Sequence, residues 1–246
     1  MKKYLFIFNI HTLLILVLSL LASFISLRFQ INFYVDFIFL GVFIAIPLTF
    51  TLREAFRRRE RAIQYLSAFS AALKSSYYYF EISKLEGEKK LEFKNHLINV
   101  SDKLIQYLSA ETSEASLVQK ASDDVFIFMQ ANKENFKGRF SEKILSFQYR
   151  INESIDFLLA TKRHHTPWGI RATILFAIYM FVIFYPASLL GDIGFDVALW
   201  YVFVMTGFKG FILISFCNVQ MLLEDPFNQD SPEGIRINDF RFHVYE

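Results

Sequence analysis

Residues 31–66 read INFYVDFIFLGVFIAIPLTFTLREAFRRRERAIQYL, an apolar run that passes directly into a cluster of arginines. As an α-helix, residues 31–52 would extend roughly 33 Å, close to the ~30 Å thickness of the hydrocarbon core of a bilayer. No turn signal separates this part from the arginines at 53–61, and apolar residues then recur every three or four positions. We therefore predict a single helix that crosses a membrane and continues into a helical layer on its positively charged side.

The composition is typical of an integral membrane protein with a substantial aqueous portion. Hydrophobic residues make up 54% of the chain, and they gather in four blocks, two on each side of a long polar segment. The net charge of +2 is too small to indicate a nucleic-acid-binding protein. Cys217 is the only cysteine, so no intrachain disulfide can form, and its apolar neighbours predict an unreactive thiol.

Four apolar segments are long enough to be transmembrane helices, at 4–27, 31–52, 170–190 and 197–223. The first follows Met-Lys-Lys and resembles a signal peptide. Its apolar run is longer than the roughly 7–15 residues of a signal peptide's apolar region, so we expect a retained helix.

The segment between the second and third spans is predicted to be helical throughout. No proline occurs between Pro47 and Pro167, and glycine occurs there only at 87 and 138. Stripes of apolar residues at helical spacing predict four helices separated by polar turns at 83–90, 109–116 and 132–138. The predicted fold is all-α, with transmembrane helices in 1–52 and 169–223, a helical domain at 53–168, and a C-terminal segment at 224–246 that packs on this domain.

The distribution of basic residues predicts the orientation in the membrane. One end of the predicted spans carries Lys2, Lys3, the arginines at 53–61, Lys162, Arg163 and Arg171, whereas the other end offers Arg28 and the acidic Asp192 and Asp196. The positive-inside rule then places both termini and residues 53–168 in the cytoplasm. The expected location is a cell membrane, either a plasma membrane or a bacterial inner membrane.

The second span carries a row of apolar residues on one helix face. Val42, Ile46 and Phe50 stand four positions apart and therefore share a face; we call them the apolar row. Arg53 and Arg57 continue this face and would attract anions. If several subunits surround an axis, the row forms stacked apolar rings of the kind that gate ions by dewetting. Contact with lipid or with another helix explains the spacing equally well.

Besides Arg171 at the start of the third span, Asp36 and Lys209 are charged residues within predicted spans. Asp36 lies in the outer turn of the second span and Lys209 lies inside the fourth, and ionisable residues at such depths commonly mark ion pathways. Lys209 either has a structural partner, such as Asp36 or a helix end, or belongs to an anion route.

Signatures of catalysis are missing from the sequence. It contains no glycine-rich phosphate loop, H-E-x-x-H, C-x-x-C or G-x-S-x-G. The adjacent His164 and His165 would point in different directions on a helix, which disfavours joint metal binding. We expect neither an enzyme nor a cofactor.

Two stretches and the order of the spans resemble those of bestrophins and their bacterial relatives. Leu223-Glu224-Asp225-Pro226-Phe227 is similar to the family's I-E-(D/N)-P-F-G segment, and an apolar and acidic run at 235–240 follows it. The predicted helix at 31–66 is similar to the family's F-R-x-x-x-x-Y-x-R-W-W-E segment, with Phe50, Phe56 and Arg58 at the matching Phe, Tyr and Arg. Departures are Thr51 after the matching Phe, Arg59 and Glu60 in place of the paired tryptophans, and Asn228 after Pro-Phe.

The resemblance implies a homopentameric channel for small anions such as chloride. It implies that the second helices line the pore and that the apolar row forms its narrow neck. Animal bestrophins bind calcium with an acidic run after Pro-Phe. This chain keeps only Asp225, Asp230 and Glu233 there, so these are weak metal candidates.

Two other functions are compatible with the same sequence. One is a non-conducting membrane scaffold whose cytoplasmic helices bind a partner protein or anionic lipid through the arginines at 53–61. The other is a carrier that uses Asp36 and Lys209 as charges near the middle of the membrane.

Overall fold

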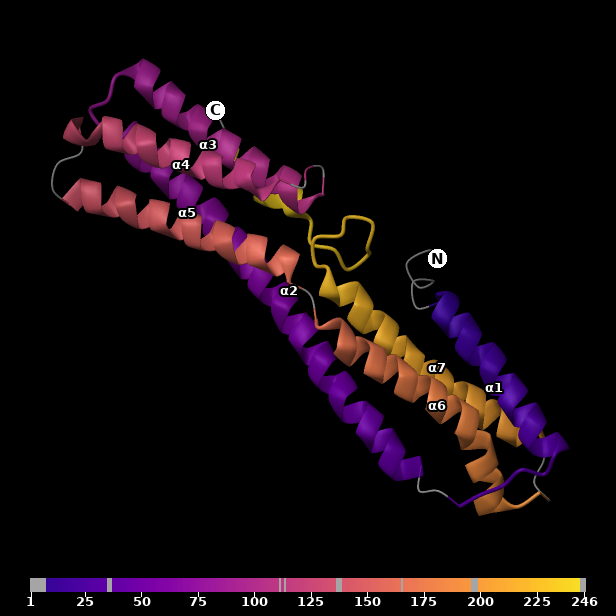
Figure 1. Ribbon diagram of the computed structural model, residues 1–246. Helices are drawn as coiled ribbons and strands as arrows, with labels where there is room; N and C mark the ends of the chain where they lie inside the picture. Colours follow the sequence, from indigo (N-terminus) through magenta and orange to yellow (C-terminus); the bar gives the residue numbers. More distant parts are fainter. Residues whose placement is uncertain are drawn as a thin grey trace. The chain divides into compact units, whose positions relative to one another are not determined.

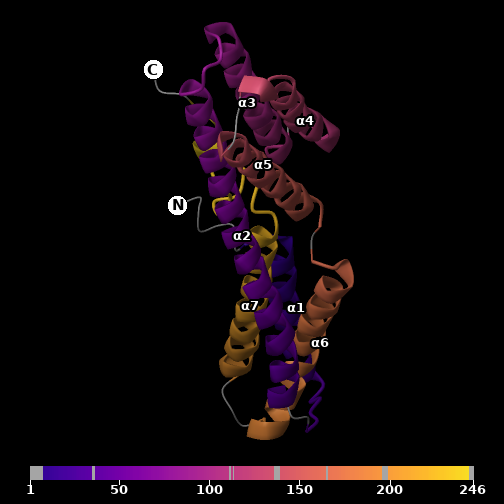
Figure 2. The same ribbon diagram turned by 90° about the vertical axis from the view of Figure 1, so that its left-hand side faces the viewer.

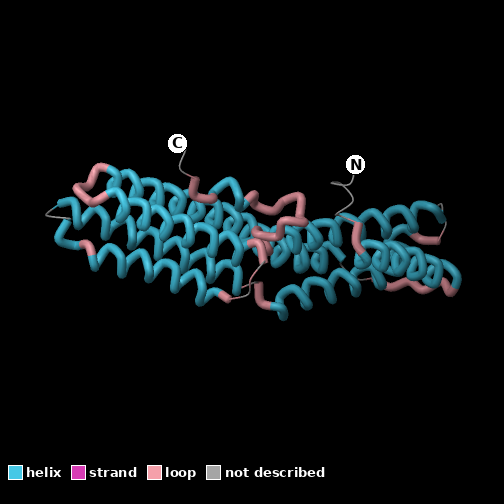
Figure 3. The backbone as a smooth tube through the Cα atoms, turned by 90° about the horizontal axis from the view of Figure 1, so that it is seen from above, coloured by secondary structure: helices cyan, strands magenta, loops and turns pink. Residues whose placement is uncertain are grey.

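The computed structural model describes residues 8–34, 37–110, 112, 114–135, 139–164, 166–195 and 199–243. Its elements are α1 (Ile10–Arg28), α2 (Phe37–Glu81), α3 (Gly87–Leu108), α4 (Ala115–Ala131), η2 (Lys133–Asn135), α5 (Arg139–Arg163), α6 (Trp168–Ile193), α7 (Leu199–Glu224) and η3 (Ile237–Phe240). The described residues contain no strand (Figure 3). The predicted all-α fold is confirmed.

The chain divides into two compact units. The first contains residues 1–57 and 166–224 and the second contains 58–165 and 225–246. We call them the apolar-helix unit and the four-helix unit. Helix α2 contributes its first part to one and its remainder to the other.

In the apolar-helix unit, α1, α6 and α7 pack against one another (Figure 1). Within the described residues, these three helices are long and apolar enough to cross a membrane. They match the predicted first, third and fourth spans. A fourth crossing, by the start of α2, stays a prediction.

Polar side chains tie α1 to its neighbours. Asn9 caps the helix by accepting a hydrogen bond from the Thr12 backbone N–H at 3.0 Å. Its side-chain amide donates to Asn218 on α7 at 2.8 Å, and His11 lies 3.0 Å from the hydroxyl of Tyr179 on α6. These hydrogen bonds satisfy polar groups that would be costly in an apolar unit.

Helix α2 begins at Phe37, so the prediction that it starts at residue 31 is wrong. Gln30 has a positive φ of 48°, and the Ile31 N–H donates to the Ser26 carbonyl at 2.9 Å. This left-handed turn ends α1 by satisfying its free carbonyls, and it directs the chain away from a new helix. Phe33 then runs close to α6, where its carbonyl oxygen lies 2.7 Å from the position of a Cβ on Gly191.

The four-helix unit consists of the second part of α2 with α3, α4 and α5 (Figure 2). The four predicted helices are confirmed. The turn predicted at 83–90 is shorter, because α3 already begins at Gly87. The turns predicted at 109–116 and 132–138 fall partly outside the described residues, and α4 begins at Ala115. Phe80 and Phe93 stack in the core with ring centroids 3.4 Å apart. Its other fully buried large side chains include Leu66, Phe69, Leu73, Leu97 and Leu104.

The C-terminal segment packs on this core. Phe227, Ile237 and Phe242 are buried in it. The Arg241 Nε lies 3.1 Å from a carboxylate oxygen of Asp102, and the Phe242 N–H donates to Ser101 Oγ at 2.8 Å. The segment is therefore held by apolar burial and by polar contacts with α3.

Candidate functional site

The apolar row on α2 is open to its surroundings. Val42, Ile46 and Phe50 are 49%, 52% and 65% exposed, whereas Ile44 and Leu48 on the same stretch are 1% and 5% exposed. The buried pair belongs to the core formed with α1, α6 and α7. One face of α2 therefore packs within the apolar-helix unit, and the apolar row lies on a face that the described chain leaves uncovered.

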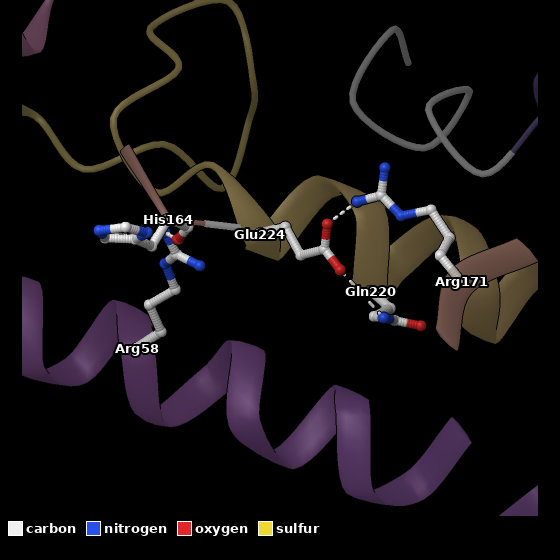
Figure 4. Close-up of polar contacts among 5 residues, drawn as sticks. All are labelled: Arg58, His164, Arg171, Gln220 and Glu224. Atoms are coloured by element: carbon white, nitrogen blue, oxygen red, sulfur yellow. Dashed lines mark hydrogen bonds and ion pairs between the residues drawn. The ribbon is translucent and has the colours of Figure 1, made fainter. Parts of the chain in front are cut away.

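The arginines that follow the row fall into two groups. Arg53 and Arg57 are exposed. Arg58 instead donates through its guanidinium to the carbonyls of Thr161 and His164, at the end of α5. These are carbonyls that a helix end leaves without intrahelical partners. Figure 4 shows Arg58 beside His164. Arg59 Nε donates to the Glu233 carbonyl at 3.0 Å, so part of the cluster has a structural role.

An ion pair that the sequence did not reveal lies at one end of the apolar-helix unit. Glu224, the last residue of α7, is 2% exposed and pairs with Arg171 in the first turn of α6 (Figure 4). Gln220 donates to the other carboxylate oxygen at 3.0 Å. The sequence did contain a signal for this pair. Because α6 and α7 are antiparallel neighbours, an arginine at the start of one and a carboxylate at the end of the other lie at the same end of the unit.

Lys162 joins two helix ends in the four-helix unit. Its ammonium donates to the carbonyls of Tyr107 and Leu108 at 2.6 and 2.8 Å, at the C-terminus of α3. Burial lowers the pKa of Lys162, and the nearby Asp225 carboxylate partly opposes this effect by favouring the charged form. A cation at a helix C-terminus also complements the helix dipole.

Among the acidic metal candidates, Asp225 makes a contact through its carboxylate in the turns after α7, whereas Asp230 and Glu233 make contacts through their backbones. An Asp225 carboxylate oxygen accepts from the Phe227 N–H at 3.2 Å. The Asp230 N–H donates to the Asn228 side chain at 2.9 Å, and Glu233 uses its carbonyl to bind Arg59. Among the described residues, no three His, Cys, Asp or Glu side chains gather as a metal site would require. Asp225, Asp230 and Glu233 stay weak metal candidates, and no calcium role is proposed for them.

Of the two charged residues predicted at membrane depth, Asp36 and Lys209, the structure describes one. Asp36 lies outside the described residues. The Lys209 ammonium is 4.3 Å from the ring centroid of Tyr185 on α6, which is a cation–π contact. A contact of this kind partly compensates a charge inside an apolar helix.

Comparisons with known proteins identify the fold. No family model and no curated protein sequence matches the chain. Solved structures do match: two mutant forms of a bacterial bestrophin homologue from Klebsiella pneumoniae superpose with TM-scores of 0.78 and 0.74 at 16% and 17% identity. Each alignment covers 94% of this chain, and 94% and 93% of those chains, respectively.

The chain has the bestrophin fold. A structure described only as a mutant membrane protein gives a TM-score of 0.80 at 16% identity, over 94% of this chain and 93% of that one. The predicted resemblance to bacterial bestrophins is thereby confirmed at the level of the fold. The similarity in sequence is low, since about five residues in six differ in these alignments.

Proposed function

We propose that the chain is one subunit of an oligomeric channel, a homopentamer, that conducts small anions such as chloride. The observation that carries this proposal is the exposure of the apolar row on α2 opposite a buried face. The start of α2 thus has two apolar faces, one buried and one uncovered. Such an arrangement is expected when the uncovered face meets other subunits or lines an axial pathway. The bestrophin fold supports the second arrangement, in which the uncovered face lines an axial pathway.

The proposed topology has four spans. Phe37–Leu52 at the start of α2 contains no charged residue and would cross most of the hydrocarbon core at about 1.5 Å per residue. Together with α1, α6 and α7, it forms the membrane part. The basic residues at 53–61 support a cytoplasmic location for the termini and for residues 53–168, with the spans in a plasma membrane or a bacterial inner membrane.

Conduction proceeds in two steps in this proposal. The exposed guanidinium groups of Arg53 and Arg57 attract anions to the cytoplasmic mouth. The anions then pass rings of Val42, Ile46 and Phe50, where apolar walls hold little water and so control the current. Arg58 takes no part, because its guanidinium is bonded to the end of α5.

Replacement of all three residues of the apolar row by alanine tests this role. We expect a higher conductance or looser gating of the purified protein in a planar bilayer under a chloride gradient, since smaller side chains widen and hydrate the neck. The matched control replaces Val17, Leu20 and Phe24, which are exposed on α1, by alanine. An unchanged current in the first variant, with its assembly intact, contradicts the proposal.

A non-conducting scaffold is the second candidate, because Arg53, Arg57 and Arg61 are exposed and available for anionic lipid or a partner protein. Mass determination of the purified particle in detergent separates the two functions. A pentamer that passes chloride supports the channel. A monomer or dimer that carries no current supports the scaffold.

A further inference from the structure

The apolar-helix unit contains an open cavity of about 710 Å³ next to Lys209. It lies among α6, α7 and the start of α2. The aromatic and charged side chains that line it are Tyr34, Phe37, Tyr185, Asp192, Tyr201 and Lys209. On α7, the lining residues Tyr201, Met205 and Lys209 stand four positions apart and so share one face. They span about 12 Å along the helix axis.

The charges of this cavity are separated along its length. Asp192 is exposed in the last turn of α6, near the connection to α7, whereas Lys209 lies well inside α7. The buried ring of Tyr185 lies 4.3 Å from the Lys209 ammonium. Among the residues that the structure describes, no carboxylate lies within ion-pair distance of Lys209. The cavity therefore presents a cation well inside α7 and an exposed carboxylate at the end of α6.

A second cavity of about 350 Å³ adjoins the first, because Phe37 and Lys209 line both. Its other walls are apolar and come from Gly41, Val42 and Ala45 on α2, Phe181 on α6, and Ile212 and Leu213 on α7. Among the described residues that line this second cavity, Lys209 is the one that carries a charge. The two cavities thus offer, in order, a carboxylate, aromatic hydroxyls, an ammonium and an apolar chamber.

We infer that these adjoining cavities together bind one zwitterionic phospholipid. The Lys209 ammonium binds the phosphate, as a charge-assisted hydrogen-bond donor. The amine of the headgroup lies toward the opening, where Asp192 and the faces of Tyr34 and Tyr201 favour a cation. An acyl chain enters the apolar chamber beside Ala45. Charge order and apolar surface both match the order of groups in such a lipid.

The lipid would also reach the channel proposed above. Val42 belongs to the apolar row and borders the apolar chamber, so an acyl chain there would touch α2 at the level of the neck. This one consequence rests on the proposed function. The binding site itself does not, because it is defined by α2, α6 and α7 of a single chain.

Native mass spectrometry of the delipidated full-length protein in detergent tests the site, with phosphatidylethanolamine as the probe. We expect Lys209→Met to weaken lipid binding at least about tenfold and Lys209→Arg to restore most of it. Asp192→Asn should reduce the preference for phosphatidylethanolamine over phosphatidylglycerol. The matched control, Lys120→Met, removes an exposed lysine of the four-helix unit and should bind lipid like the unchanged protein.

A second variant tests the apolar chamber without touching the charges. Ala45→Phe fills it and should weaken binding of the phospholipid while leaving binding of soluble phosphoethanolamine unchanged. Equal lipid binding by the unchanged protein and Lys209→Met overturns the inference. Phosphoethanolamine that competes as well as the whole lipid also overturns it, and would indicate a site for free anions. Because bound lipid is measured rather than current, the result stands whether or not the particle conducts.

Discussion

The ion pair between Arg171 and Glu224 makes the most direct prediction about stability. Glu224 is 2% exposed and the Arg171 side chain is 28% exposed, so the pair is largely withdrawn from water. It joins the first turn of α6 to the last residue of α7, directly before the turn at Asp225. We expect Glu224→Ala to destabilise the apolar-helix unit, because it leaves a guanidinium facing protein without its partner.

The size of the effect follows from the burial. Removal of one partner of a buried pair costs about 3–5 kcal/mol of unfolding free energy. Since Arg171 retains some contact with water, we expect the lower end, about 3 kcal/mol. For a chain of this size, each kcal/mol lowers the unfolding temperature by about 2–4 °C, which gives a fall of roughly 6–12 °C. Replacing both residues by methionine should recover most of it, because neither buried charge remains.

Thermal unfolding in detergent, followed by intrinsic tryptophan fluorescence, measures this effect. Trp168 and Trp200 both belong to the apolar-helix unit. Glu54→Gln is the matched control, since Glu54 is an exposed carboxylate of the same unit, and it should change the unfolding temperature by less than about 2 °C. A fall for Glu224→Ala no larger than this control refutes the reasoning. A chain with methionine at both 171 and 224 that is less stable than Glu224→Ala also refutes it.

Three further predictions concern packing and charge. Burial lowers the pKa of Lys162 below its usual 10.5, so the unfolded chain binds the proton more tightly than the folded chain. The unfolding free energy of the unchanged chain, measured by denaturant titration, should therefore rise relative to that of Lys162→Met as pH rises toward 10.5. A difference between the two chains that shrinks with pH contradicts this. Ser101→Ala leaves a buried N–H of the C-terminal segment without an acceptor, at a cost of about 1–3 kcal/mol, and should speed proteolysis of that segment. Gly191→Ala places a Cβ against the Phe33 carbonyl and should lower the unfolding temperature, whereas Gly169→Ala, with open space around it, should not.

The sequence predicted those features that depend on local periodicity. The apolar residues at helical spacing located α3, α4 and α5, and the length of the apolar runs located α1, α6 and α7. The burial of Phe227 and Phe242 followed from their apolar character in a polar tail. The uncovered apolar row was also visible as a helix face, although its exposure could be established only when the opposite face was seen to be buried.

The sequence by itself determined that the chain is all-α, that apolar helices flank a polar helical segment, and which face of each helix is apolar, because a repeat of 3.6 residues is written in consecutive positions. Only the tertiary structure decided that α2 starts after a left-handed turn at Gln30, that Arg58 binds the end of α5, and that Glu224 meets Arg171. The last two depend on which helix ends come together in space. Arg171 and Glu224 are 53 positions apart, and Arg58 is more than a hundred positions from its partners, so no periodic pattern records either contact. The turn depends on a positive φ at Gln30, a conformation that residues other than glycine seldom adopt.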